Sequence, residues 1–154
     1  MEVNVMYKKM LVPLDGSALA ESVLPHVVAI AKAFNIADVW LLGVIEPIEF
    51  HAVEPFSWAD IENLRKQHEK TVEEYIKHIA QRLEKEGVAV KSSVEEGAVA
   101  ESILKFTESR GIDLIVMATH GRSGIGRWVY GSVADKVLRA AKTPVLLVRS
   151  NAST

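Results

Sequence analysis

The sequence predicts an α/β fold, a single domain in which strands and helices alternate around a parallel β-sheet. Segments 38–46 and 112–118 are short and almost wholly apolar, which is the composition of strands buried on both faces of a sheet. Between such segments lie longer stretches whose apolar residues recur at helical spacing, and this alternation favours a parallel sheet with helices on both faces. A chain of 154 residues suits one compact domain, which we expect to span 1–154 with an ordered core of about 7–149.

The first strand is predicted over Lys8–Asp15 and ends in a carboxylate. Gly16 and Ser17 supply a turn and an N-cap for the helix that follows. The apolar periodicity of this helix runs from about Ala18 to Phe34, but Pro25 lies inside it. Because a proline inside a helix costs about 3 kcal/mol, we expect a kink or a late helix start there. The second strand is the apolar segment 38–46 described above.

The longest helix is predicted from a capping box at 57–60 to about Glu86, before a glycine that ends it. The residues expected on its inward face are Ile61, Leu64, His68, Val72, Tyr75, Ile76, Ile79 and Leu83. His68 and His78 are interpreted as ordinary helix residues, because neither has a second metal-type ligand four residues on. The connection before this helix, 47–56, is longer than most loops of its kind, and such loops are often functional.

The C-terminal half continues the alternation. Segment 88–94 carries lysine and serine among its apolar residues, which suits an edge strand. Gly97 starts a helix and Gly111 closes it before the strand at 112–118. The residues expected to face inward from this helix are Val99, Ile103, Leu104 and Phe106. With a helix at 133–141 and a last strand at 145–148, five strands and four helices are predicted.

A glycine-rich loop, 119–132, joins the strand at 112–118 to the helix at 133–141. A strand, a glycine-rich loop and a helix N-terminus together aim unpaired backbone N–H groups at an anion, and phosphate is the natural guest. Arg122 and Arg127 bring positive charge to the same loop. The loop fits neither the Walker pattern nor a complete GxGxxG. The alternative is that its glycines only form turns and its arginines are a solvated rim.

Charge and composition exclude several classes of protein. The net charge is −2 with both signs interspersed, so no basic field is present to attract nucleic acid. The chain has no cysteine, hence no disulfide or thiolate metal site. The N-terminus lacks a signal pattern, and no apolar run approaches the roughly 20 residues that span a bilayer. We therefore expect a cytoplasmic protein that contacts neither nucleic acid nor membrane.

One loop motif resembles a known family. Residues 117–121 (Met-Ala-Thr-His-Gly), nine further residues and then Gly131-Ser132-Val133 are similar to the nucleotide-binding signature of the universal stress protein family. That signature has two glycines separated by two residues, nine more residues, and glycine followed by serine or threonine. Gly121, Gly131 and Ser132 match it, whereas Ala118 replaces the first glycine. The resemblance extends over nearly the whole chain, from Met10 to Val148.

The resemblance implies a Rossmann-like, five-stranded parallel sheet of order 3-2-1-4-5, with a ligand crevice between the first and fourth strands. It also implies that Asp15 holds the ribose or adenine region, that the backbone of Val44 meets the adenine edge, and that the loop surrounds the phosphates. The nucleotide-binding residues so assigned are Pro13, Leu14, Asp15, Val44, Met117, Ala118, His120, Gly121, Arg122, Arg127, Gly131, Ser132 and Val133. From the residues alone, Asp15 is equally explained as an acid at a helix N-terminus.

The function that the resemblance implies is that of an ATP-binding, dimeric regulator or sensor in the stress response. ATP, ADP and AMP are all candidate ligands, and Mg²⁺ is left open. Two alternatives remain: a nucleotide-independent dimeric interaction module whose loop is impaired by Ala118, and a slow ATPase. His120 is the only candidate base in the loop, but it equally suits a hydrogen-bond donor or a spacer, so no catalytic residue is assigned. We interpret the connection 47–56 as a lid over the adenine.

The last strand also predicts a partner. Val145, Leu146, Leu147 and Val148 are expected at an edge of the sheet, yet no charge or proline among them discourages pairing. A second copy pairing antiparallel along this strand gives a homodimer, as the family resemblance also implies. The alternative is that helices or the C-terminal tail cover this edge.

Overall fold

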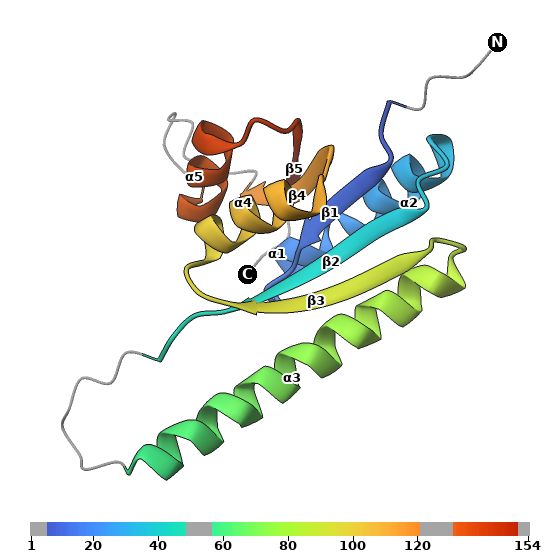
Figure 1. Ribbon diagram of the computed structural model, residues 1–154. Coiled ribbons are helices and arrows are strands. Elements are labelled where there is room, and N and C mark those ends of the chain that lie inside the picture. The colour runs from blue at the N-terminus through green and yellow to red at the C-terminus, as the bar shows by residue number, and fades with distance from the viewer. Residues whose placement is uncertain (1–5, 49–56, 121–130, 151–154) are drawn as a thin grey trace.

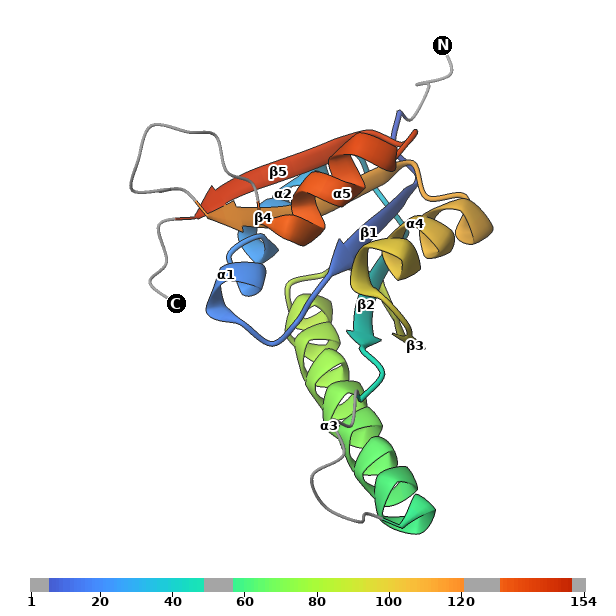
Figure 2. The ribbon, with the colours of Figure 1, turned by 90° about the vertical axis from the view of Figure 1, so that its left-hand side faces the viewer.

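The computed structural model describes residues 6–48, 57–120 and 131–150. They form one five-stranded sheet of order β3-β2-β1-β4-β5, in which every pair is parallel (Figures 1 and 2). The strands are β1 (Lys9–Pro13), β2 (Asp38–Ile45), β3 (Val90–Glu96), β4 (Leu114–His120) and β5 (Val145–Ser150). The predicted fold class and strand order are therefore confirmed.

The described helices are α1 (Ala18–Glu21), α2 (Leu24–Ala33), α3 (Trp58–Lys85), α4 (Val99–Arg110) and α5 (Ser132–Ala140). The single helix expected over 18–34 is in fact two, α1 and α2. Pro25 lies in the first turn of α2. A backbone N–H at that position would have no acceptor within the helix, so proline loses no hydrogen bond there. Ser17 is the N-cap of α1, as predicted, and its side chain accepts from the N–H of Ala20.

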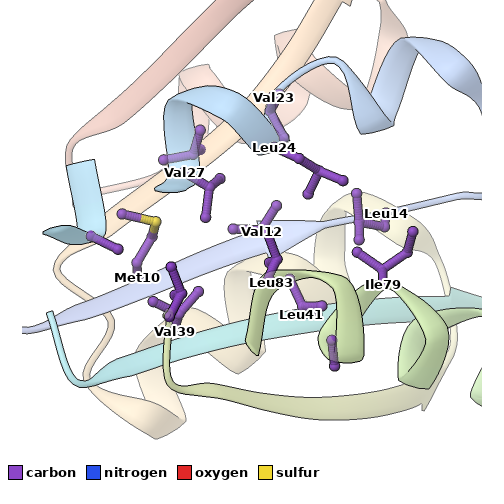
Figure 3. Packing of buried hydrophobic residues seen from close by; sticks show 14 of the residues in the cluster. Met10, Val12, Leu14, Val23, Leu24, Val27, Val39, Leu41, Ile79 and Leu83 are labelled. Carbon is purple, nitrogen blue, oxygen red and sulfur yellow. The ribbon is translucent and has the colours of Figure 1, made fainter. Parts of the chain in front are cut away.

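Alternate residues of the strands divide the core into two layers. Val12 and Leu41 face α2 and α3 in one layer, shown in Figure 3, where they meet Val27, Ile79 and Leu83. The opposite face of the sheet packs against α4 and α5. Its buried residues are Leu11, Leu42, Ala100, Ile103, Phe106, Ile112, Ile115, Met117, Ala134 and Val137. The two-residue period of a strand thus places helices on both sides of the sheet.

Helix α3 is longer than the strands that it covers, and its N-terminal half extends past the sheet (Figure 1). The predicted capping box is present, with reciprocal hydrogen bonds between Ser57 and Asp60. The prediction that Leu64 faces inward is wrong, since its side chain is 44% exposed and only the C-terminal half of α3 carries buried residues. The helix approaches the sheet closely at Gly43, where an added Cβ would lie 2.6 Å from Cγ1 of Val72.

Two strands begin later than predicted, at Val90 and Leu114. In both cases the apolar residue after the helix-ending glycine bonds to the end of the preceding helix and does not join the strand. The Val88 N–H donates to the Leu83 carbonyl, and the Ile112 N–H to the Thr107 carbonyl. β3 and β5 form the two edges of the sheet, as predicted. Within the described ranges, no helix combines the length and apolarity that crossing a bilayer requires.

Candidate functional site

A cleft of about 440 Å³ opens at the carboxyl ends of β1, β2 and β4. The strand order reverses between β1 and β4, and ligands of open α/β sheets bind at such points. Nine of the predicted binding residues line this cleft: Pro13, Leu14, Asp15, Val44, Met117, Ala118, Gly131, Ser132 and Val133. The predictions for Gly121, Arg122, Arg127 and the His120 side chain fall outside the described residues.

Asp15 lies in the turn after β1, two residues beyond the end of the strand. Its Oδ1 accepts from the backbone N–H of Ser17 at 2.9 Å and from the Ser17 hydroxyl at 2.6 Å. Ser17 in turn caps α1. The turn therefore holds the carboxylate at the mouth of the cleft, where among the described donors only Ser17 bonds to it. Oδ2 is left to accept from a ligand hydroxyl.

The backbone of Val44 faces the same space. Leu14 N–H donates to Leu42 O, and Gly97 N–H donates to Ile45 O, so these two β2 carbonyls point to opposite sides. By the two-residue period of a strand, the polar backbone groups of Val44 share the side of Leu42. β1 has already ended there, because its last register partner is Pro13 with Leu42. Val44 thus presents its N–H and C=O to the cleft.

The N-terminus of α5 forms another wall. Gly131 is its N-cap and has no side-chain cap hydrogen bond. The first intrahelical bond runs from the N–H of Asp135 to the Gly131 carbonyl, at 2.9 Å. The N–H groups of Ser132, Val133 and Ala134 therefore have no acceptor within the helix, and their positive dipole end is directed at the cleft. This arrangement binds anions without requiring a basic side chain.

Ala118, which replaces the first glycine of the motif, occupies an ordinary strand position in β4 with Val148 as its register partner. Among the described residues other than glycine, positive φ occurs only at Asn35. The Ala118 methyl packs against the core layer of α2 and α3. An alanine therefore costs the backbone nothing at this position.

Several residues that line the cleft are not among the binding residues predicted from the sequence. Thr119 from β4, Glu46 after β2, and Val99 and Ile103 from α4 all line the cleft. His68, interpreted above as an ordinary helix residue, reaches the cleft from α3. Among the described lining residues the charged side chains are Asp15 and Glu46, and no lysine or arginine is among them.

Helix α3 is joined to α1, the helix that follows the loop carrying Asp15. Arg82 of α3 makes a 2.9 Å ion pair with Glu21 of α1. Tyr75, also from α3, packs against the core layer of α2 and α3. Its hydroxyl is buried without a hydrogen-bond partner among the described residues. Burial, reinforced by the negative charge of Glu21, raises the pKa of the Tyr75 phenol to about 12.

Comparison with known proteins identifies the family of this chain. The model of the universal stress protein family matches residues 6–149. The chain belongs to the universal stress protein family. Two relatives from Methanocaldococcus jannaschii are universal stress protein MJ0531, 35% identical over 94% of this chain and 83% of that protein, and MJ0577, 33% identical over 96% and 98%.

Solved structures of this family match nearly the whole of this chain. The structure of MJ0577 matches 96% of this chain and 99% of its own at 34% identity, with a TM-score of 0.76. A universal stress protein in complex with cAMP matches 94% of this chain and 98% of its own at 22% identity, with a TM-score of 0.67. One from Archaeoglobus fulgidus in complex with dAMP matches 94% and 99% at 20% identity, with a TM-score of 0.61.

Proposed function

We propose that this universal stress protein binds an adenine nucleotide in the cleft and acts as a nucleotide-dependent regulator in the stress response. The observation that carries the proposal is the meeting of three complementary groups in one cleft. The Asp15 carboxylate accepts from ribose hydroxyls, the backbone of Val44 pairs with the adenine edge, and the N-terminus of α5 binds phosphate. The cAMP and dAMP complexes of related proteins support an adenine nucleotide as the class of ligand.

ATP is the nucleotide that we propose, with ADP and AMP as the alternatives. The described residues that line the cleft include two carboxylates and no lysine or arginine. The distal phosphates therefore need positive charge from groups outside this lining. We assign that role to Arg122 and Arg127 of the adjoining loop, with Mg²⁺ as a further source. Three or four charge-assisted contacts of about 1.5–3 kcal/mol each suffice for micromolar binding after the cost of association.

Calorimetric titration with ATP, ADP, AMP and GTP, each with and without Mg²⁺, tests the proposal. Mass spectrometry of the purified protein first establishes whether a nucleotide has co-purified. One site per chain in the micromolar range, with GTP at least tenfold weaker, is the expected result. A nucleotide-free protein that binds none of the four contradicts the proposal and favours the interaction module. The strand conformation of Ala118 argues against that module, because this substitution leaves the cleft wall intact.

We also propose that the chain is a single domain over 1–154, that it works in the cytoplasm, and that it forms a homodimer. β5 is an edge strand, and Leu146 on it is 36% exposed. Antiparallel pairing of two β5 strands satisfies the open edge and covers Leu146 in the same contact. Sedimentation equilibrium tests the dimer. A concentration of about 100 micromolar populates even a weak dimer, so a monomer at that concentration contradicts the proposal.

A further inference from the structure

The hydroxyl of Thr119 is an unusual group in this fold. Its residue is only 3% exposed, and its Oγ1 has no hydrogen-bond partner among the described residues. The other buried threonine of the described chain, Thr107, donates its hydroxyl to the Ile103 carbonyl at 2.8 Å. Buried polar atoms in native proteins are nearly always paired, so a partner for Thr119 is to be sought beyond the described residues, and a bound ligand is one source.

The position of this side chain indicates where that partner lies. Strand alternation places Thr119 on the same face as Ile115 and Met117, which is the face covered by α4 and α5. Thr119 lines the cleft together with Gly131 and Ser132, so this residue and the N-terminus of α5 border the same space. A hydroxyl donor beside unpaired helical N–H groups is an arrangement that suits an anionic oxygen.

The order of the strands then identifies which oxygen. Across the sheet, Val44 belongs to β2, Asp15 follows β1, and Thr119 belongs to β4, and these strands are consecutive neighbours. Adjacent strands are about 4.8 Å apart. Base, sugar and first phosphate are likewise successive units of a nucleotide, so a nucleotide with its base at Val44 and its ribose at Asp15 brings its first phosphate to Thr119.

We infer that Thr119 Oγ1 donates a hydrogen bond to the phosphate attached to the ribose, and that the cleft formed by the described residues is a nucleoside monophosphate site. The inference rests on the proposed nucleotide-binding function. Thr119 and the N–H groups at the start of α5 hold this phosphate through neutral donors, which agrees with the absence of lysine and arginine from the described lining. The distal phosphates of ATP extend beyond this site.

The test compares Thr119→Val, which keeps the shape and removes the hydroxyl, with Thr119→Ser, which keeps the hydroxyl. Calorimetry measures the affinity of each protein for adenosine, AMP and ATP. Thr119→Val is expected to weaken AMP and ATP by a similar factor of at least about ten and to leave adenosine unchanged, because a hydrogen bond to a charged group is lost. Thr119→Ser is expected to stay within about threefold of wild type, since the donor remains.

Each other outcome counts against the inference. An equal loss for adenosine places the hydroxyl on the nucleoside, and a loss for ATP alone places it on a distal phosphate. Wild-type affinity in Thr119→Val contradicts the inference while the proposed function stands, whereas a wild-type protein that binds no adenine ligand contradicts both. Thermal unfolding of the unliganded proteins gives a second readout. Thr119→Val should be at least as stable as wild type, and marked destabilisation means that the hydroxyl has an internal partner.

Discussion

Replacing Gly131 by valine separates nucleotide binding from folding. Gly131 has φ −54° and ψ 153°, an extended conformation that valine adopts readily. Among the described residues, a Cβ added there meets no atom within 4 Å. The substitution therefore introduces no backbone strain and no clash at the Cβ. Loss of glycine freedom in the unfolded chain, which typically stabilises a protein by about 0.4–1 kcal/mol, opposes the cost of placing valine at the N-cap of α5. Because these two effects oppose each other, the free energy of unfolding should change by about 1 kcal/mol or less.

Binding should respond in the opposite way. The new methyl groups stand at the cleft wall, beside the N–H groups of Ser132 and Val133. Excluding a phosphate from two such donors removes contacts of about 1.5–3 kcal/mol each. The total of at least about 3 kcal/mol corresponds to a loss of affinity of about a hundredfold or more.

Calorimetry with ATP and AMP, together with urea unfolding of the unliganded protein, measures both effects. Gly131→Ala is the matched control, since its single methyl should weaken binding less than valine does. Unchanged affinity in Gly131→Val would refute the assignment of phosphate to the N-terminus of α5. Lost binding that is accompanied by several kcal/mol of destabilisation would instead refute the reasoning from the open space around Gly131.

Three further predictions concern packing, pH and assembly. Gly43→Ala places a Cβ 2.6 Å from Cγ1 of Val72, about 1 Å closer than a normal carbon contact. The substitution should lower the free energy of unfolding in urea by about 1–3 kcal/mol. A double mutant with Val72→Ala that recovers none of this loss contradicts the close approach of α3. The raised pKa of Tyr75 means that its neutral form favours the folded state, so this contribution is complete below pH 10 and is lost as pH rises toward about 12. Wild type should lose more stability than Tyr75→Phe over this interval, by about 1–2 kcal/mol after screening of the partly exposed ring, and parallel curves contradict the burial argument. Leu146→Lys puts like charges on both strands of the proposed β5 pair and should weaken the dimer at least about tenfold in sedimentation equilibrium, whereas an unchanged dimer places the interface elsewhere.

Local sequence was enough to predict most elements of this fold. Apolar runs gave the strands, Ser57 and Asp60 marked the start of α3, and Gly111 marked the end of α4. These signals act within a few residues, through capping hydrogen bonds and left-handed backbone, and so they are visible without tertiary information. The strand order is different, because it depends on distant contacts. It was expected from the family resemblance and is confirmed by the structure.

The sequence by itself determined the alternating elements, the position of Asp15 after β1 and the glycine-rich start of α5. Only the tertiary structure decided that His68 and Ile103, from helices on opposite faces of the sheet, border the same cleft. It also decided that the Thr119 hydroxyl is buried beside α5, since the signature at 117–121 includes this threonine but assigns it no role. The physical reason is that a side chain's partners are set by neighbouring strands and helices far away in the chain, and burial is a property of the packed sheet rather than of any segment.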